Sequence, residues 1–233
     1  SSERKNLWYG LELGPGDGIL SALLAPALGC TGLSLLDSGD YADKDINKYK
    51  RQINGHKQKF HQYSLPDYSN CLSTDEMLES AGGSYYTKGL ASLKILKDNS
   101  FDIIYSQAVL EHVRRNEFSE TMQHCRRLLK SDGVMSHVVD FKDHLGGNLN
   151  NLRFSSSLWE QEWFAVKSNF YTNRLRFSEI VKICEESGFE VKVVYISHYD
   201  TIPIKRNLLS KEFTHLSDED LSVSETHLVM QSK

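Results

Sequence analysis

Proline is scarce in this sequence, and cysteine is both scarce and scattered. The chain of 233 residues contains 4 prolines and 4 cysteines. Four prolines are too few to mark a boundary between domains. The cysteines lack the paired spacing of a structural zinc site, and they are too few and too far apart for a small disulfide scaffold. We therefore expect one domain from a reducing compartment, which predicts a cytoplasmic protein. The four cysteines are Cys30, Cys71, Cys125 and Cys184.

Long hydrophobic runs and an excess of positive charge are also missing. No apolar run reaches the ~18 residues that a membrane-spanning helix needs, and no signal peptide is visible. The formal net charge is -4, which disfavours a nucleic-acid partner. The composition, 39% hydrophobic and 25% charged, is typical of a soluble globular protein that is long enough to bury a full core.

Short apolar runs alternate with longer segments in which apolar residues recur at helical spacing. This alternation predicts an α/β fold with a mainly parallel sheet and helices on both faces. No helical segment separates the last two runs, so we expect them to pair antiparallel at one edge. The strand-like runs are 7–13, 32–37, 59–65, 101–106, 133–141, 191–197 and 226–231. Helices are expected over 19–28, 43–53, 117–129 and 177–187, and Pro26 should end the first one early.

Glycine is concentrated directly after the first predicted strand, at Gly14, Gly16 and Gly18. In a parallel sheet, ligands bind beyond the carboxyl ends of the strands, and glycine lets the backbone turn tightly and approach a ligand. A dinucleotide-binding loop needs glycine at its sixth position, where this chain has Ile19. The preceding acid, Glu12, suits a cationic ligand better than a diphosphate. Both features disfavour a nicotinamide-dependent oxidoreductase.

An acid, Asp37, ends the second predicted strand. At this place a carboxylate can accept hydrogen bonds from the two hydroxyls of a ribose. A simpler interpretation stays open for both features. Asp37 could only cap a helix, and the glycines could only serve a tight turn between a strand and a helix.

Four segments in order along the chain resemble the class I S-adenosylmethionine-dependent methyltransferases. They are ELGPGDG at 12–18, the acid Asp37, SFDIIYSQAVLEHV at 100–113 and RLLKSDG at 127–133. The resemblance covers nearly the whole chain. It implies one methyltransferase domain over 1–233, with a doubly wound, seven-stranded, mostly parallel Rossmann-like sheet and an antiparallel edge strand. It also implies S-adenosylmethionine as cofactor, with S-adenosylhomocysteine as product. The family normally has a helix or two before its first strand, so we expect a shortened or partial chain.

The resemblance also implies which residues contact the cofactor. Glu12, Gly14 and Gly16, with the neighbouring Asp17, are expected along its methionine part. Asp37 is expected at the ribose, with Ser38 or Gly39 beside the adenine. Ser106 and Gln107 are expected to approach the methyl-bearing sulfur through their backbone. At the position where the family often has an acid near the adenine amine, this chain has Gly89 and Leu90 instead.

Candidate catalytic residues follow the fourth and fifth predicted strands. A hydroxyl is a poor nucleophile at neutral pH, so an oxygen acceptor usually needs a histidine or carboxylate within hydrogen-bond reach. We expect His144 to act as the base, with Asp140 orienting it or the acceptor, and His112 is the second candidate. His144 could also be a loop histidine without a role. His137, Asp140 and His144 could form a metal set, but His137 should point into the core if Asp140 points to the sheet edge. We therefore expect no metal.

Segment 142–176 is expected to be an acceptor-binding insertion, because it combines flat aromatic rings with arginines. Such side chains can bind a sugar or an anionic acceptor. We expect Tyr171, Arg174 and Trp163 to bind the acceptor. The tryptophans could equally pack on the core. The aromatic and basic residues concerned are Trp159, Trp163, Phe164, Phe170, Tyr171, Arg174 and Arg176.

The stretch from Asp140 to Glu179 also resembles methyltransferases of polysaccharide and surface-sugar biosynthesis, which implies methylation of a sugar hydroxyl. The expected partner is therefore a small-molecule acceptor, and the sequence leaves the oligomeric state open. A second hypothesis is a non-catalytic methyltransferase-like domain that serves as a binding or scaffolding part of a larger protein. The intact Glu12 and glycine loop argue against it, because a domain that no longer binds the cofactor does not need them.

Overall fold

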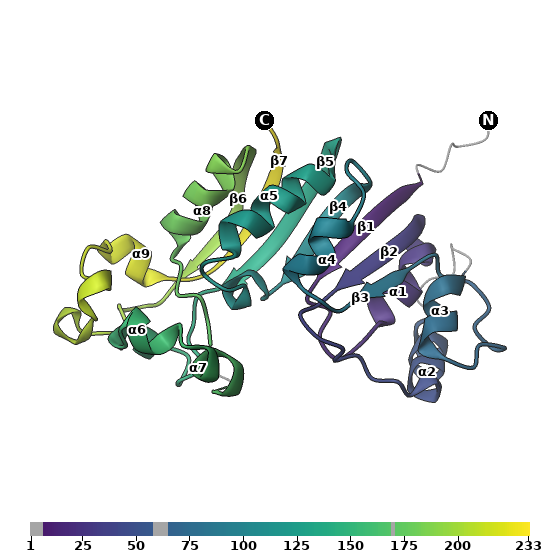
Figure 1. Ribbon diagram of the computed structural model, residues 1–233, viewed down its shortest axis with the longest axis horizontal. Helices are drawn as coiled ribbons and strands as arrows, with labels where there is room; N and C mark the ends of the chain where they lie inside the picture. The colour runs from purple at the N-terminus through teal and green to yellow at the C-terminus, as the bar shows by residue number, and fades with distance from the viewer. Residues whose placement is uncertain (1–6, 58–64, 169–170) are drawn as a thin grey trace. The chain divides into compact units, whose positions relative to one another are not determined.

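The computed structural model describes residues 7–57, 65–168 and 171–233. The chain divides into two compact units. The N-terminal unit comprises Ser1–Ser106 and Arg127–Met135, and the C-terminal unit comprises Gln107–Arg126 and Ser136–Lys233 (Figure 1). The chain passes from one unit to the other after Ser106, after Arg126 and after Met135.

The described residues form a seven-stranded sheet with the strand order β3-β2-β1-β4-β5-β7-β6. Strand β1 pairs parallel with β2 and with β4, and β2 pairs parallel with β3, whereas β6 and β7 pair antiparallel. The predicted α/β fold, a mostly parallel sheet with an antiparallel edge, is confirmed. The strands are β1 (Trp8–Leu13), β2 (Cys30–Leu36), β3 (Ser84–Tyr86), β4 (Phe101–Gln107), β5 (Leu129–Asp140), β6 (Phe189–His198) and β7 (Val223–Ser232).

Helices of the N-terminal unit follow β1, β2 and β3 along the chain. Pro26 ends the first helix early, as predicted: α1 (Leu20–Leu24) passes into the 3-10 turn η1 (Ala25–Leu28), which ends at Gly29 with a φ of 83°. The buried core of this unit includes Leu23, Leu33 and Tyr49. The remaining helices are α2 (Ile46–Lys57), α3 (Thr74–Ser80) and α4 (Leu90–Ile95).

The third strand of the structure is not the one that the sequence predicts. The predicted strand at 59–65 lies outside the described residues, apart from Leu65, which is in no strand. Strand β3 is instead a three-residue strand after Gly82 and Gly83. The turn before β3 approaches β2 closely where Gly82 meets Gly32. A Cβ on Gly32 would lie 2.1 Å from the carbonyl oxygen of Gly82. This close approach restricts both positions to glycine.

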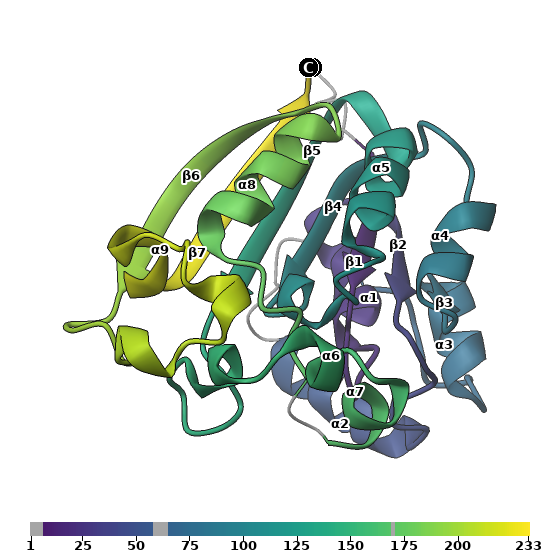
Figure 2. The ribbon, with the colours of Figure 1, turned by 60° about the vertical axis from the view of Figure 1, so that its left-hand side comes forward.

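Two longer helices of the C-terminal unit occur where the sequence predicts them, as α5 (Phe118–Leu128) and α8 (Phe177–Glu186). Figures 1 and 2 show α8 beside β6, with which it is in contact. Strand β5 begins directly after α5, earlier than predicted, and runs through the expected turn at 131–133. The shorter helical segments are η2 (Leu110–His112), η3 (Asn150–Arg153), α6 (Ser156–Trp159), α7 (Glu162–Lys167), η4 (Arg206–Leu208), η5 (Lys211–Phe213) and α9 (Asp218–Ser222).

The expectation that no helical segment separates the last two strands is wrong. The connection from β6 to β7 contains η4, η5 and α9, which pack with the segment after β5 into a small separate core. The two strands still pair antiparallel, with Val191 opposite Met230. The core residues are Leu149, Leu152, Ile204, Leu209, Phe213, Leu216 and Leu221. None of the helices in the described part of the chain is long and apolar enough to cross a membrane.

Candidate functional site

The glycine loop joins the end of β1 to the start of α1. Gly14 and Gly16 have φ values of 64° and 70°, a conformation that side chains rarely adopt. The Gly14 N–H donates to the carbonyl oxygen of Leu36 at 2.8 Å, which fixes the loop against the end of β2. A Cβ on Gly16 would meet no atom within 4 Å. Gly16 is therefore required by its backbone conformation, and its face of the loop is open.

Asp37 connects the glycine loop with the two segments that follow β2 and β3. Its carboxylate accepts hydrogen bonds from the N–H of Gly16 at 3.3 Å and of Ser38 at 2.7 Å. Its carbonyl oxygen accepts from the N–H of Gly89 at 2.8 Å. Gly89, which precedes Leu90 at the start of α4, has a φ of 48°. The structure thus brings together four residues that the sequence predicts around the ribose and adenine: Asp37, Ser38, Gly89 and Leu90.

Gly39 lies beneath an aromatic side chain. A Cβ on Gly39 would meet the Tyr41 ring at 2.6 Å, and the Gly39 carbonyl oxygen accepts a hydrogen bond from the Tyr85 hydroxyl at 3.1 Å. Ser106 is buried, and its Cα is paired in register with that of Leu13, next to the glycine loop. Gln107 follows at the end of β4 and is exposed.

Glu12 is half-buried at the end of β1. The hydroxyls of Ser21 and Tyr105 donate to the same carboxylate oxygen, Oε2, and the bond from Tyr105 is 3.0 Å long. Burial raises the pKa of Glu12, and the two hydrogen bonds partly offset this effect. The second oxygen, Oε1, accepts no hydrogen bond from the described residues.

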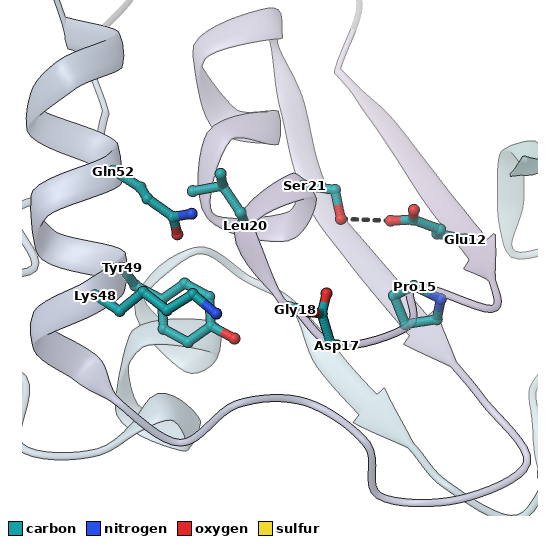
Figure 3. Close-up of a pocket in the computed structure, with 9 residues that line it drawn as sticks. All are labelled: Glu12, Pro15, Asp17, Gly18, Leu20, Ser21, Lys48, Tyr49 and Gln52. Carbon is teal, nitrogen blue, oxygen red and sulfur yellow. Dashed lines mark hydrogen bonds between the residues drawn. The ribbon is translucent and has the colours of Figure 1, made fainter.

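A cavity of about 260 Å³ opens beside the glycine loop (Figure 3). Helix α2 is joined to the loop here through the Tyr49 hydroxyl, which accepts from the N–H of Ile19 at 3.3 Å and donates to the carbonyl oxygen of Asp43 at 3.0 Å. Sequence reasoning missed the α2 residues, because nothing in the polar helix pattern says what it faces. The cavity is lined by Glu12, Pro15, Asp17, Gly18, Leu20, Ser21, Lys48, Tyr49 and Gln52.

A protein-family model described as a methyltransferase domain matches residues 3–193. The chain belongs to this family. The resemblance seen in the sequence is thereby confirmed: the chain carries the domain of the class I S-adenosylmethionine-dependent methyltransferase family, whose cofactor is S-adenosylmethionine. No curated protein matches the sequence.

Solved structures share the methyltransferase fold at low sequence identity. An arsenic(III) S-adenosylmethionine methyltransferase from Chlamydomonas reinhardtii is 13% identical over 97% of this chain, with a TM-score of 0.57. A methyltransferase from Methanosarcina mazei is 14% identical over 97% of this chain and 92% of its own, with a TM-score of 0.52. A Haloferax volcanii protein in complex with the Trm112 methyltransferase activator is 15% identical over 97% of this chain and 82% of its own, with a TM-score of 0.51. This methyltransferase spans 64% of the length of the algal enzyme.

The predicted catalytic residues of the methyltransferase lie in its C-terminal unit, where two of them come together. The rings of His112 and His144 have centroids 5.1 Å apart and are tilted by 32°. Asp140 is bound elsewhere, because its Oδ1 accepts from the N–H and from the Nζ of Lys142, both at 2.9 Å. No hydrogen bond joins Asp140 to His144 among the described residues. His137 is fully buried, as expected from its position on β5.

The loop that carries His144 is anchored by Asp143. This buried carboxylate accepts hydrogen bonds from four backbone N–H groups of the loop that follows it, which makes it the structural centre of that loop. His144 itself is exposed in this loop, which follows β5. The donors are the N–H groups of Leu145, Asn148, Asn150 and Asn151.

His112 has a defined tautomer. Its Nδ1 lies 3.1 Å from the carbonyl oxygen of Tyr171. A carbonyl can only accept, so Nδ1 carries the hydrogen and Nε2 keeps its lone pair. Desolvation lowers the pKa of His112 and the nearby His144 adds to this effect, whereas the hydrogen bond to the Tyr171 carbonyl and the charge of Asp140 oppose it. The net shift favours the neutral imidazole.

Glu111 is a functional candidate that sequence reasoning missed. Only 5% of its surface is exposed, and its Oε1 accepts the N–H of Asp140 at 3.3 Å. The other oxygen, Oε2, has no hydrogen-bond partner in the described part of the chain. Burial raises the pKa of Glu111 to about 8. The sequence did offer one indication of this residue, because Glu111 is an acid that directly precedes His112 among apolar residues.

The three predicted acceptor-binding residues lie in different environments. Trp163 is 55% exposed. Arg174 is 3% exposed, and its guanidinium lies over the rings of Trp159 and Phe213 and donates to the carbonyl oxygen of Phe154 at 2.6 Å.

Tyr171 is also buried, and its hydroxyl donates to Glu160 at 2.9 Å. Trp159 is fully buried, so for this tryptophan the packing alternative holds. Phe170 lies outside the described residues. Contact of Tyr171 or Arg174 with an acceptor stays a prediction.

Proposed function

We propose that this methyltransferase transfers the methyl group of S-adenosylmethionine to a hydroxyl of a small acceptor, a sugar or a related metabolite. The observation that carries the proposal is the pair of imidazole rings, His112 and His144, 5.1 Å apart in the C-terminal unit. An oxygen acceptor needs a proton acceptor beside it, and an imidazole can serve as one.

The residues after β1, β2 and β3 fit the cofactor. The open backbone of Gly16 leaves room for a ligand, and the carboxylate of Asp37 beside it can accept hydrogen bonds from a ribose. The anionic Glu12 suits a ligand with cationic groups. When bound, S-adenosylmethionine supplies a methyl group activated by a sulfonium. We propose that Glu12, Gly14, Gly16, Asp17, Asp37, Ser38, Gly39, Gly89, Leu90, Ser106 and Gln107 hold it.

His144 is the proposed base for the acceptor hydroxyl. It is the member of the pair on the exposed loop after β5, and Gly146 and Gly147, both with positive φ, give that loop its turn. His112 lies against it with a fixed tautomer, and two adjacent imidazoles disfavour a charge on both. Asp140, which lies close enough to raise the pKa of His112, would orient the acceptor.

The sugar is the finer part of the proposal, and segment 142–176 supports it. This segment presents the indole of Trp163 to solvent, with its Nε1 donating to Gln161 at 2.7 Å. An exposed indole offers an apolar face beside a polar N–H, which suits an acceptor that has both apolar and polar surface. We propose that 142–176 is the acceptor-binding insertion of a single domain over 1–233.

The test is transfer of labelled methyl from S-adenosylmethionine to a panel of acceptors that begins with sugars. The H144A and H112A variants would be compared with H215A, which removes an exposed histidine of the same unit. Methylation of a sugar that both variants slow, and H215A does not, would support the proposal. Binding of the cofactor without methylation of any acceptor would favour a non-catalytic binding domain.

A further inference from the structure

The turn that carries His112 is held by one side chain from a distant part of the sequence. Asn173 is 1% exposed, and its Nδ2 donates to the carbonyl oxygens of Leu110 at 2.7 Å and of Val113 at 3.0 Å. These two carbonyls lie on either side of Glu111 and His112. The amide nitrogen has two hydrogens, so both are used, and the turn is held before and after the histidine.

The backbone next to this side chain adds two contacts with the same turn. The Asn173 N–H donates to the carbonyl oxygen of Glu111 at 2.7 Å. The carbonyl oxygen of Tyr171 accepts the hydrogen on Nδ1 of His112 at 3.1 Å. Each of the four residues from Leu110 to Val113 is therefore bonded to segment 171–173.

The amide of Asn173 has one favourable orientation. Its Oδ1 accepts from the N–H of Leu175 at 3.0 Å, while its Nδ2 faces two carbonyl oxygens. Exchanging the oxygen and the nitrogen would place acceptor against acceptor and donor against donor. Aspartate, which has the same shape but no donor, cannot replace it.

We propose that Asn173 is a positioning residue for methyl transfer: through the turn at 110–113 it fixes the place and the tautomer of His112, so that Nε2 keeps its lone pair. The assignment rests on the proposed function, in which the paired rings of His112 and His144 lie beside the acceptor hydroxyl. His112 is exposed although its Nδ1 is bound, which leaves the ring accessible to a ligand.

Segment 171–173 is itself held by Arg115. The Arg115 guanidinium donates to the carbonyl oxygen of Asn173 at 3.2 Å and to Glu179 at 2.6 Å, and its backbone N–H donates to the Tyr171 hydroxyl at 3.2 Å. The next residue, Arg174, has a φ of 60°. Such a backbone conformation persists only where surrounding contacts impose it, and it is concentrated at functional sites.

Nitrogen NMR of the free protein, labelled at its histidine rings, tests the assignment without an acceptor. At about pH 8 the His112 ring is neutral, since its ordinary pKa of about 6.5 is lowered here. Wild-type His112 should carry its hydrogen on Nδ1 alone, and H112A identifies its signals. N173D keeps an acceptor for Leu175 but loses both donors to the turn. We expect it to give a mixture of the two tautomers.

T226V is the matched control for loss of a buried hydrogen bond. Thr226 is a fully buried residue of the same unit, and its hydroxyl donates to the carbonyl oxygen of Tyr195 at 2.8 Å. T226V should be less stable than the wild type but should keep the wild-type signals of His112. The melting temperature of each variant would be measured alongside.

Transfer of labelled methyl to the panel of sugars measures the consequence for the reaction. N173D should lower kcat by roughly 10- to 100-fold, because a small displacement of a reacting group costs about that much. Its affinity for S-adenosylhomocysteine should stay unchanged. T226V should change neither quantity.

Two results would overturn the assignment: wild-type signals of His112 in N173D, or a kcat of N173D as high as that of T226V. If N173D does not fold, N173S is the second variant. Its hydroxyl supplies a single donor, so it should also give a mixture of tautomers, and one tautomer alone would count against Asn173. A wild-type protein that methylates no acceptor would overturn the proposed function, while the ring signals would still report on Asn173.

Discussion

The two units of this methyltransferase present their candidate residues in different ways. In the N-terminal unit, the glycine loop and Asp37 offer mostly backbone groups at strand ends, held by bonds such as Gly14 N–H to Leu36. In the C-terminal unit, the candidates are side chains on loops, and several of them, such as Arg174, are committed to the unit's own packing. This contrast fits the proposed function, in which the N-terminal unit binds the cofactor and the C-terminal unit binds the acceptor.

The largest expected effect is on the C-terminal side of this comparison. Replacing His144 by alanine should reduce turnover by roughly 10²–10⁴-fold, because a general base contributes about that much. Donor affinity should stay nearly unchanged. Single-turnover methyl transfer and calorimetry on the same preparation measure both quantities. Equal turnover in H144A and H215A would remove His144 from the mechanism.

The converse variant is D37A in the N-terminal unit. Removing a carboxylate that receives hydrogen bonds from a ribose should weaken S-adenosylhomocysteine about 10- to 100-fold, since bonds to charged groups contribute about 1.5–3 kcal/mol. D200A, which removes an exposed acid of the C-terminal unit, serves as the control. If D37A binds as tightly as D200A, the division of labour between the units is wrong.

The next prediction concerns stability within the N-terminal unit. G32A should destabilise the protein by about 1–3 kcal/mol, because the new methyl group would collide with the carbonyl oxygen of Gly82 at 2.1 Å. G55A is the matched control, since a Cβ on Gly55 would meet nothing within 4 Å. Denaturant unfolding measures both. A G32A variant as stable as G55A would show that β2 and the turn before β3 can separate without cost.

The smallest effect is a pH dependence from the C-terminal unit. Burial raises the pKa of Glu111 from 4.5 to about 8. Between these values the folded protein keeps a proton that the unfolded chain releases. The contribution of Glu111 to stability is therefore complete below about pH 4.5 and is lost as the pH rises towards 8. The wild-type melting temperature should fall more than that of E111Q between pH 5 and 8, by a few degrees. Parallel curves for the two proteins would contradict this.

The positions of the glycine loop and of Asp37 at strand ends were predictable from the sequence, whereas their contact with the donor stays a prediction. The glycine loop and Asp37 each directly follow a predicted strand. The carboxyl ends of parallel strands lie at the same edge of a sheet, so chain order alone fixes the place of both. Strand β3 was not predictable, because Ser84–Tyr86 is short and half-exposed and is held only by its pairing with β2. Lys48 and Gln52 were missed because a polar helix face carries no mark of the cavity that it lines.

The acceptor side was harder to predict for a physical reason. Aromatic rings followed by arginines describe a ligand-binding surface and a packed interior equally well. The structure places Arg174 between Trp159 and Phe213 but leaves Trp163 at the surface, and no spacing in the sequence separates these outcomes. Glu111 gives the same lesson, since its functional interest comes from its burial.

The measurement that tests the central claim most directly is calorimetric titration of the purified chain with S-adenosylhomocysteine, with NAD as a parallel control. The account predicts micromolar binding of S-adenosylhomocysteine and none of NAD. Binding of NAD, or no binding of S-adenosylhomocysteine, would contradict a donor site built on Glu12, the glycine loop and Asp37.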